Sequence, residues 1–168
     1  MNFINIKSEE EIKTLANLAS EIWREYWTII LSQKQIDYML EKFQSEVAIK
    51  NQIESERYVY NILKDNANII GYFGIAPKEN YLFLSKLYIK KEFRNLGCGR
   101  LAFNKIKQIS LQLNRKSIRL TVNKNNINTI EAYKKWGFKT IDSVVTDIGS
   151  GFVMDDYIME LELQEYQA

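Results

Sequence analysis

The sequence predicts a mixed α/β fold of the α+β type, in which helices flank a central sheet, and three features support this. Two stretches within the first 45 residues carry apolar side chains at helical spacing. From residue 58 to residue 89, short apolar runs separated by polar turns are typical of consecutive β-strands. A glycine-flanked turn and a long helical pattern follow, and strand patterns fill much of the remainder up to residue 161.

The N-terminal part is predicted to form a short strand and two helices. Phe3, Ile4 and Ile6 indicate the strand. Ser8 followed by three glutamates is a helix-start signature, because a hydroxyl caps the first turn and acids favour its positive end. The apolar stripe of this helix consists of Ile12, Leu15, Ala16, Ala19, Ile22, Trp23 and Tyr26. Residues 33–43 repeat the pattern with Ile36, Met39, Leu40 and Phe43.

The middle of the chain is predicted to form a meander of three strands. Residues 58–63 and 68–75 indicate two strands, and the polar residues 64–67 between them predict an antiparallel hairpin. Residues 77–80 form the next turn, and residues 81–89 are the third strand. This third strand leads directly into the glycine-flanked turn.

That turn carries the features of a phosphate-binding site. Gly97 and Gly99 lack Cβ atoms where the chain must turn, which lets another molecule approach the backbone. The helix that follows begins with unpaired N–H groups and the positive end of its dipole. Arg94 and Arg100 flank the turn, and an arginine can hold a phosphate through two hydrogen bonds. The basic residues that gather here, opposed locally only by Glu92, are Lys86, Lys90, Lys91, Arg94, Arg100, Lys105 and Lys107.

The rest of the chain predicts two helices and three strands. The helix that starts at Gly99 ends near Asn114, and residues 117–122 alternate as a half-buried strand. A second helical stretch stops at Gly137, since glycine after the last turn is a common helix terminus. Residues 141–161 indicate two closing strands joined around residues 149–151. The apolar face of the first of these helices consists of Ala102, Ile106, Ile109 and Leu113.

The composition predicts one soluble domain over residues 1–168. Hydrophobic residues make up 46% and charged residues 26%, and a net charge of +2 predicts neither nucleic acid nor a membrane surface as a partner. Cys98 is the one cysteine and histidine is absent, so we expect no disulfide, no Cys–His nucleophile and no typical zinc site. The sequence shows no signal peptide or membrane-length apolar run, so we expect a cytoplasmic protein.

Two motifs resemble those of the GNAT N-acetyltransferase superfamily. Residues 94–99, Arg-Asn-Leu-Gly-Cys-Gly, resemble its R/Q-x-x-G-x-G/A signature. Residues 126–138 resemble the pattern N-x-x-A/S-x-x-x-Y-x-K-x-G-F, with Thr129 where a smaller residue is usual. The resemblance covers residues 58–161 well and the first 57 in outline. It implies the GNAT fold, with a mixed, mostly antiparallel central sheet flanked by helices, and acetyl-CoA as co-substrate.

The glycine turn also permits two other interpretations. Residues 97–102 fit the dinucleotide pattern G-x-G-x-x-G/A, which requires an acidic residue about twenty positions later. The corresponding residues 121–123 are Thr-Val-Asn and contain no carboxylate. A plain glycine turn without a ligand is the other interpretation. The order and spacing of the two motifs favour the GNAT interpretation over both.

The resemblance implies which residues contact the cofactor. In GNAT proteins the strand before the turn offers backbone groups to the pantetheine arm, and one N–H group polarises the thioester carbonyl. The turn itself would hold the diphosphate. On this basis we expect acetyl-CoA to be bound by Leu87, Tyr88, Ile89, Arg94, Asn95, Leu96, Gly97, Cys98, Gly99, Arg100, Asn126, Thr129 and Lys135.

Acetyl transfer to an amine also needs an acid and a base. The family places its general acid at the position of Tyr133, whose phenol can donate a proton to the departing thiolate. An amine with a pKa of about 10.4 is neutral in only about one molecule in 2,500 at pH 7, so a base or a desolvating pocket must offset this. Without histidine, a carboxylate or a tyrosine must serve, and Glu25, Glu46, Asp155 and Asp156 are all eligible.

The acceptor is predicted to be an amine of a small molecule or a peptide. In GNAT proteins the first two helices and their connection commonly cover the acceptor, so Trp23, Tyr26 and Trp27 are candidates for its walls, and Asp155 for a further contact. Acidic segments would attract a polycation, and the outline is similar to bacterial polyamine N-acetyltransferases. Peptide N-termini, amino sugars, aminoglycosides, longer acyl chains and a homodimer stay open. A non-catalytic acyl-CoA-binding module is the alternative from another functional class.

Overall fold

The structure is a computed structural model that describes residues 1–163. Its residues form two compact units. The first comprises Met1–Ala76 and Lys86–Ile106, and the second comprises Pro77–Ser85 and the chain from Lys107 onward. Strand β4 (Tyr81–Ile89) and helix α4 (Cys98–Gln112) contribute residues to both units. The strands hydrogen-bond in the order β1-β2-β3-β4-β5-β7-β6.

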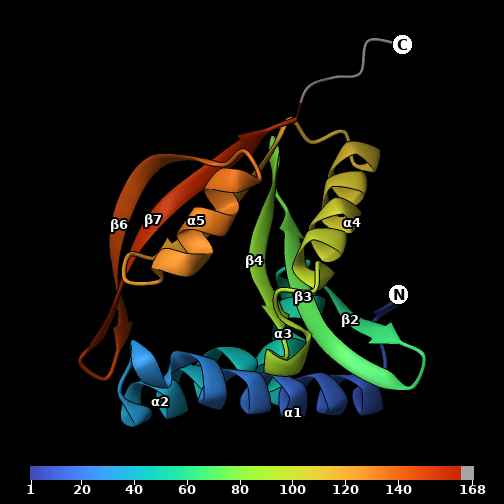
Figure 1. Ribbon diagram of the computed structural model, residues 1–168. Helices are drawn as coiled ribbons and strands as arrows, with labels where there is room; N and C mark the ends of the chain where they lie inside the picture. The colour runs from blue at the N-terminus through green and yellow to red at the C-terminus, as the bar shows by residue number, and fades with distance from the viewer. Residues whose placement is uncertain (164–168) are drawn as a thin grey trace, which may run out of the picture. The chain divides into compact units, whose positions relative to one another are not determined.

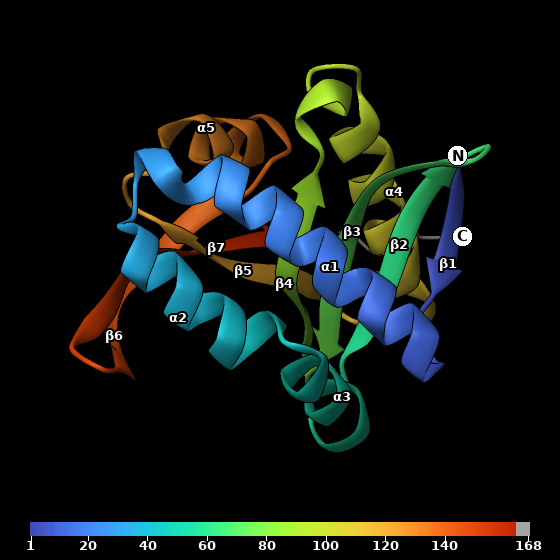
Figure 2. The same cartoon turned by 90° about the horizontal axis from the view of Figure 1, so that it is seen from below.

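The first unit places helices on both faces of three antiparallel strands. Helix α1 lies across β2 and β3 on one face, and the start of α4 lies on the other (Figures 1 and 2). The pairs β1–β2 and β2–β3 are antiparallel, as the predicted hairpin requires. Besides β4 and α4, the elements are β1 (Asn2–Asn5), α1 (Glu9–Tyr26), α2 (Gln33–Gln44), α3 (Glu46–Ser55), β2 (Val59–Asp65) and β3 (Asn68–Pro77), with short 3₁₀ turns at Trp27–Ile29 and Lys91–Phe93.

The start of α1 is fixed by the predicted capping box. The Ser8 hydroxyl accepts a hydrogen bond from the Glu11 backbone at 3.2 Å, and the Glu11 carboxylate accepts one from the Ser8 backbone at 2.9 Å. The apolar stripe of the helix then packs on β2 and β3. Its core with these strands contains Ile12, Leu15, Leu18, Ala19, Ile22, Ile49, Tyr60, Ile62 and Tyr72. This packing holds the C-terminal end of α1, with its aromatic residues, next to β3 and the end of β4.

Strand β4 runs unusually close to β3 at a glycine. A Cβ atom on Gly71 would lie 2.1 Å from the carbonyl oxygen of Tyr88, so only glycine fits at this position. Immediately beyond, the Lys90 backbone N–H donates to the Ile70 carbonyl at 2.8 Å. The end of β4 is therefore fixed against β3 just before the glycine turn begins.

The second unit contains the start of β4, the end of α4, three further strands and helix α5. Strand β5 (Ser117–Asn123) runs parallel to β4 and antiparallel to β7 (Phe152–Glu162), which also pairs with β6 (Lys139–Gly149). Helix α5 (Ile127–Lys135) lies beside β6 and β7 (Figure 1). It stops at Gly137 as predicted, with φ +99°. The β6–β7 hairpin turns through Ser150 and Gly151, both with positive φ.

Helix α3 is an element that the sequence pattern did not predict. It begins at Ser45, whose hydroxyl accepts a hydrogen bond from the Ala48 backbone at 3.2 Å. Only Ile49 and Gln52 on this helix are buried, so its apolar face is narrow. Among the helices of residues 1–163, none is long and apolar enough to span a membrane.

Candidate active site

The predicted phosphate-binding turn has the backbone geometry that a bound anion requires. Asn95 and Gly97 adopt positive φ angles of 61° and 82°. A Cβ atom on Gly97 would meet nothing within 4 Å, so this side of the turn is open. The first bond of α4 runs from the Leu101 N–H to the Gly97 carbonyl at 3.0 Å, which leaves the N–H groups of the first helical turn without intrahelical partners. Unpaired N–H groups at an open helix N-terminus are suited to binding an anion, and the expected contact with coenzyme A stays a prediction.

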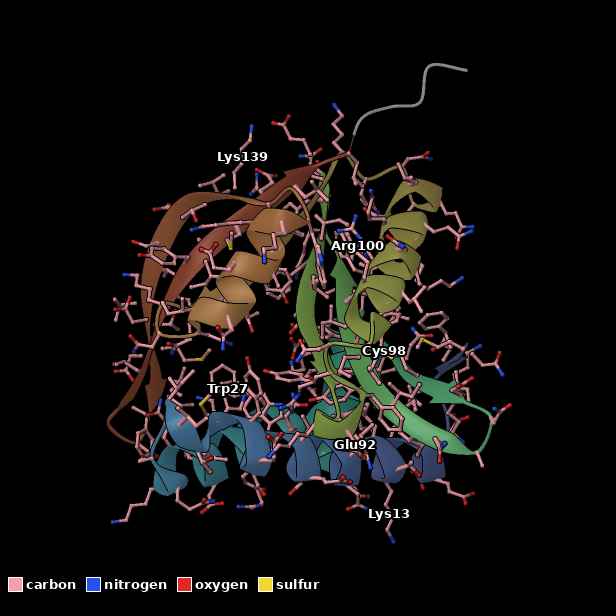
Figure 3. All side chains as sticks on the ribbon, viewed as in Figure 1. Lys13, Trp27, Glu92, Cys98, Arg100 and Lys139 are labelled. Carbon is pink, nitrogen blue, oxygen red and sulfur yellow. The ribbon has the colours of Figure 1, made fainter. Side chains whose placement is uncertain are left out.

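The two ends of α4's first turn differ in exposure. Figure 3 labels Cys98 and Arg100 on this helix. The Cys98 thiol is buried, with 9% of the residue exposed, whereas Arg100 is exposed. The Cys98 side chain therefore packs against the protein at the start of the helix, whereas Arg100 faces solvent. The cofactor contacts expected of Asn95, Leu96, Cys98, Gly99 and Arg100 stay predictions.

Arg94 is engaged by groups of the protein itself. Its Nη1 and Nη2 atoms donate to the two carboxylate oxygens of Glu25 at 3.1 and 2.5 Å, and its Nε donates to the Ile89 carbonyl at 2.9 Å. The guanidinium carbon lies 5.0 Å from the centre of the Tyr26 ring. The side chain therefore ties the turn to the end of α1, and its expected contact with the cofactor stays a prediction.

The charge balance around the turn differs from the sequence prediction. Glu92 was expected to be the only acid opposing the basic residues, and this was wrong. Helix α1 supplies two more, because Glu21 pairs with Lys90 at 2.9 Å and Glu25 pairs with Arg94. These acids are distant in the sequence, so reasoning about neighbouring residues could not reveal them.

The end of β4 carries the residues expected to contact the pantetheine arm. The β4–β5 register covers Tyr81 to Phe83, whereas β4 continues to Ile89. The Tyr88 ring stacks on Tyr72 at 5.5 Å, so a cofactor contact from Tyr88 would come from its backbone. The roles expected of Leu87, Tyr88 and Ile89 stay predictions.

The aromatic residues expected to form the acceptor walls lie together in the first unit. The Trp23 ring is 5.9 Å from Trp27 and 5.5 Å from Tyr88, and the Tyr26 ring is 5.3 Å from Trp27. Trp23 and Trp27 are only 4% and 8% exposed, so both also belong to the core. Within residues 1–163, the buried indole N–H of Trp27, labelled in Figure 3, has no hydrogen-bond partner. Their substrate contacts stay predictions.

Tyr133 lies on α5 in the second unit and is 8% exposed. Its ring is 5.6 Å from Trp136 and 5.4 Å from Phe138, and its backbone carbonyl accepts a hydrogen bond from the Phe138 N–H at 3.0 Å. The helix end thus fixes the position of the ring through both its side-chain and backbone contacts. The proposed role as general acid is consistent with such fixed geometry, and it stays a prediction.

The other motif residues of α5 differ in burial. Asn126 is the N-cap residue, is 6% exposed, and makes no capping hydrogen bond through its side chain. Its backbone N–H donates to the Asn123 carbonyl at 2.9 Å. Thr129 is half-buried and Lys135 is exposed. The cofactor contacts expected of these three residues stay predictions.

The two adjacent aspartates of β7 lie in different environments. Asp155 is exposed and pairs with Lys124 at 2.6 Å. Asp156 is 4% exposed, and its Oδ1 atom has no hydrogen-bond partner within the described residues. Burial, together with the nearby charge of Asp155, raises the pKa of Asp156 to about 6, against a smaller opposite effect of Lys124. The sequence favoured Asp155 for a substrate contact, since the strand pattern did not show which of the two is buried.

Lys86 on β4 is a further titratable group that sequence reasoning did not single out. Its Nζ lies 5.5 and 5.9 Å from the ring centres of Tyr58 and Tyr60. Burial lowers the pKa of this ammonium group to about 8. No sequence signal distinguishes it from the neighbouring lysines, because its environment depends on residues of β2.

Comparisons with known proteins agree on one family. The model of the acetyltransferase (GNAT) domain matches residues 28–161. The spermidine N(1)-acetyltransferase of Thermoplasma acidophilum is 28% identical over 152 residues, which are 88% of this chain and 92% of that protein.

Solved structures share the fold. The PaiA N-acetyltransferase of T. acidophilum in complex with coenzyme A superimposes with a TM-score of 0.80 at 24% identity, covering 97% of this chain and 100% of that one. A chimera of the Vibrio cholerae spermidine N-acetyltransferase SpeG and hSSAT has a TM-score of 0.68 at 18% identity, with 96% of each chain covered. The predicted fold class is confirmed. With its family model matched over most of its length, this chain belongs to the GNAT acetyltransferases.

Proposed function

We propose that this protein transfers the acetyl group of acetyl-CoA to a primary amine, by direct attack of the amine on the thioester. The observation that carries the proposal is the open turn at Gly97, where positive φ angles and the first N–H groups of α4 form a seat for a diphosphate. A structural neighbour of the same family holds coenzyme A. Acetyl-CoA supplies the activated acetyl group, and the protein supplies binding, orientation and proton transfer.

The cofactor contacts follow from the turn and the two motifs. The diphosphate is held mainly by backbone N–H groups of residues 95–99 and by the charge of Arg100, because the guanidinium of Arg94 is already bound to Glu25. The backbone of Leu87 to Ile89 takes the pantetheine arm, and one N–H group there polarises the thioester carbonyl. Asn126, Thr129 and Lys135 complete the set of cofactor contacts.

Tyr133 acts as the general acid of this proposal. The neutral amine forms an N–C bond with the thioester carbonyl, the C–S bond breaks, and the Tyr133 hydroxyl gives its proton to the sulfur. The proton that the nitrogen loses as the amide forms restores the hydroxyl. A phenol pKa of about 10 against about 8.5 for a thiol makes this transfer slightly uphill, so position matters more than acidity. The ring contacts with Trp136 and Phe138 supply that position.

The acceptor class that we propose is a polyamine or a similar small amine. The curated relative is named for spermidine, and the family neighbours include a spermidine N-acetyltransferase chimera. The aromatic residues Trp23, Tyr26 and Trp27 would form apolar and cation–π contacts with a polyamine chain. Amino acids, peptides, amino sugars and aminoglycosides are the classes against which the proposal is tested.

A thiol-release assay tests the proposal. Purified protein is supplied with acetyl-CoA and a panel of polyamines, amino acids, aminoglycosides and peptides, and free coenzyme A is measured with a thiol reagent. We expect release that depends on a polyamine. Tyr133→Phe should then lower kcat by about 10²-fold or more. The control variant Tyr81→Phe, at the first residue of β4 and outside both motifs, should change kcat little. Full turnover of Tyr133→Phe would remove the tyrosine from the acid role.

The non-catalytic alternative makes a different prediction. An acyl-CoA-binding module would bind acetyl-CoA in a calorimeter but release no thiol with any member of the panel. Binding of NAD in place of acetyl-CoA would instead support the dinucleotide interpretation of residues 97–102.

A further inference from the structure

A buried carboxylate in the second unit has one oxygen with no partner. Asp156 on β7 is 4% exposed, and its Oδ1 atom is buried and makes no hydrogen bond within residues 1–163. Leaving an acceptor of this kind unsatisfied costs folding free energy, about 1–3 kcal/mol and more when it is charged. Such a group in a native structure therefore requires an explanation.

The strand neighbours of Asp156 do not supply a cation. Its register partners are Asn123 on β5 and Val144 on β6, which project from the same face of the sheet. The Asn123 side-chain oxygen accepts a hydrogen bond from the Asn125 backbone N–H at 2.9 Å, and Val144 is apolar. The strand neighbours of the Asp156 carboxylate are therefore the neutral amide of Asn123 and the apolar side chain of Val144.

The lysine whose charge acts on Asp156, Lys124, forms its salt bridge with the other aspartate. Lys124 Nζ lies 2.6 Å from Asp155 and 5.4 Å from the centre of the Tyr157 ring. Successive residues of a strand point to opposite faces, so Lys124 neutralises Asp155 on the face away from Asp156. Asp156 itself forms no salt bridge within the part of the chain that the structure describes.

The other carboxylates considered for the base are less suitable. Glu25 accepts two hydrogen bonds from Arg94, so both of its carboxylate oxygens are already engaged. Glu46 is exposed to solvent on the first turn of α3. Asp155 is exposed and paired. Asp156 alone among the four combines burial with an available oxygen.

The position of Asp156 relates it to the proposed acid. Asn123, its register partner, is the last residue of β5, and the chain then passes through the N-cap Asn126 into α5, which carries Tyr133. Both groups therefore belong to neighbouring elements of the same unit.

We propose that Asp156 binds the ammonium group of the acceptor and takes its proton, directly or through one water molecule. This inference rests on the proposed acetyl transfer. An N–H bond of the ammonium breaks and its proton passes to the carboxylate. The lone pair that this exposes forms the N–C bond, and the C–S bond breaks as Tyr133 protonates the sulfur. The second nitrogen proton restores the Tyr133 hydroxyl, and Asp156 returns its proton to solvent.

Asp156→Asn tests the proposal, with Asp142→Asn, at an exposed aspartate of β6, as the matched control. The asparagine keeps the shape and removes the charge. With the best amine from the thiol-release panel, kcat/KM of Asp156→Asn should fall about 10²–10⁴-fold, as expected for loss of a general base. The acetyl-CoA dissociation constant, measured by calorimetry, should be unchanged. Asp142→Asn should stay within about threefold of the wild type, because Asp142 is exposed and its carboxylate accepts a hydrogen bond from the adjacent Ser143 backbone.

A spectroscopic measurement on the wild type keeps the test independent of the variant's folding. The ¹³C resonance of the labelled Asp156 carboxyl carbon should shift when the polyamine is added to the coenzyme A complex, and the resonance of the exposed Asp142 should not. No shift at Asp156, or an Asp156→Asn enzyme with kcat/KM within threefold of the wild type, overturns the inference while leaving acetyl transfer in place. Absence of thiol release by the wild type with every acceptor overturns both.

Discussion

Arg94 and Glu25 form a two-point ion pair that joins the glycine turn to the end of α1. Both terminal nitrogens of the guanidinium contact the carboxylate, at 3.1 and 2.5 Å, while Nε is bound to the Ile89 carbonyl and the group lies over the Tyr26 ring. All three nitrogens are therefore engaged. In a GNAT enzyme, this pair would link the cofactor turn to the aromatic residues proposed for the acceptor.

A double-mutant cycle on this pair separates a structural tie from a phosphate ligand. We expect Arg94→Gln and Glu25→Gln each to lower the free energy of unfolding by about 1 kcal/mol, and the double variant to lose little more, because both remove the same interaction. Acetyl-CoA affinity should change by less than about threefold in each. Urea denaturation and calorimetry supply the two readouts. An Arg94→Gln protein that binds acetyl-CoA more than tenfold weaker, beside a normal Glu25→Gln, would make the guanidinium a phosphate ligand.

Two glycines offer a matched test of the cofactor turn. Gly97 and Gly151 have positive φ angles of 82° and 77°, and a Cβ atom on either would meet nothing within 4 Å. Alanine at each position should cost about 1–2 kcal/mol of stability, through left-handed backbone strain alone. Only Gly97→Ala should also weaken acetyl-CoA binding, by at least tenfold, since its methyl group occupies the side from which a phosphate approaches.

The comparison of the two variants is the informative quantity. Thermal unfolding should give similar losses for both, and calorimetry should separate them. Equal acetyl-CoA affinity in Gly97→Ala and Gly151→Ala would mean that the diphosphate does not sit at this turn.

Local signals in the sequence predicted most elements of the fold. The bounds of β4, residues 81–89, match because polar turns flank the strand, and Ser8 with Glu11 marked the start of α1 through their reciprocal hydrogen bonds. Helix α3 was missed because its buried face holds only Ile49 and Gln52, which is too narrow to stand out as a periodic pattern. The prediction of one domain over residues 1–168 stays a prediction, and residues 164–168 lie outside the described part of the chain.

The candidate site was less accessible from the sequence. The glycine turn and Tyr133 could be predicted from the two motifs, because each motif has its residue types at fixed spacing. The Arg94–Glu25 pair joins positions 69 residues apart, so only the packing of α1 reveals it. The choice between Asp155 and Asp156 depends on which face of β7 is buried. The sequence does not show this, because residues 152–158 place apolar and acidic side chains on both faces of the strand.

The buried hydroxyl of Tyr72 links Trp23 and Gln44 by hydrogen bonds, so removing this one oxygen atom should lower stability strongly. The Tyr72 hydroxyl accepts a hydrogen bond from Trp23 Nε1 at 3.0 Å and donates one to the Gln44 side-chain oxygen at 3.0 Å. Tyr72 is fully buried, and burial raises the pKa of its phenol well above the usual value. Tyr72→Phe should lower the free energy of unfolding by about 2–3 kcal/mol, because it leaves an indole N–H and an amide oxygen unsatisfied.

Replacing Gln44 with an apolar residue should offset part of the stability lost in Tyr72→Phe. In the double variant Tyr72→Phe with Gln44→Leu, the orphaned amide is gone, so its destabilisation should be smaller than the sum of the two single variants. Chemical denaturation of the four proteins measures the coupling. Additive losses would show that the two side chains act independently.

The raised pKa of Asp156 predicts how its replacement changes stability with pH. The group titrates at about 6 in the folded protein, and at about 3.9 in an unfolded chain. Between these values the folded state binds more protons than the unfolded state, so this group's contribution to stability falls as the pH rises from about 4 and is constant above about 7. Asparagine does not titrate. The free energy of unfolding of Asp156→Asn, relative to the wild type, should therefore rise with pH across this window.

Urea denaturation of both proteins between pH 4.5 and pH 8 measures this difference in the free energy of unfolding. The contributions of the carboxylates that both proteins share cancel in the difference. The charged groups that influence Asp156 are Asp155, which raises its pKa, and Lys124, which lowers it by a smaller amount. Asp155→Asn should consequently lower the pKa of Asp156 and narrow the window, because it removes a like charge. A stability difference that is independent of pH would show that Asp156 titrates like an exposed carboxylate. The proposal that Asp156 takes the proton of the acceptor amine would then lose its support.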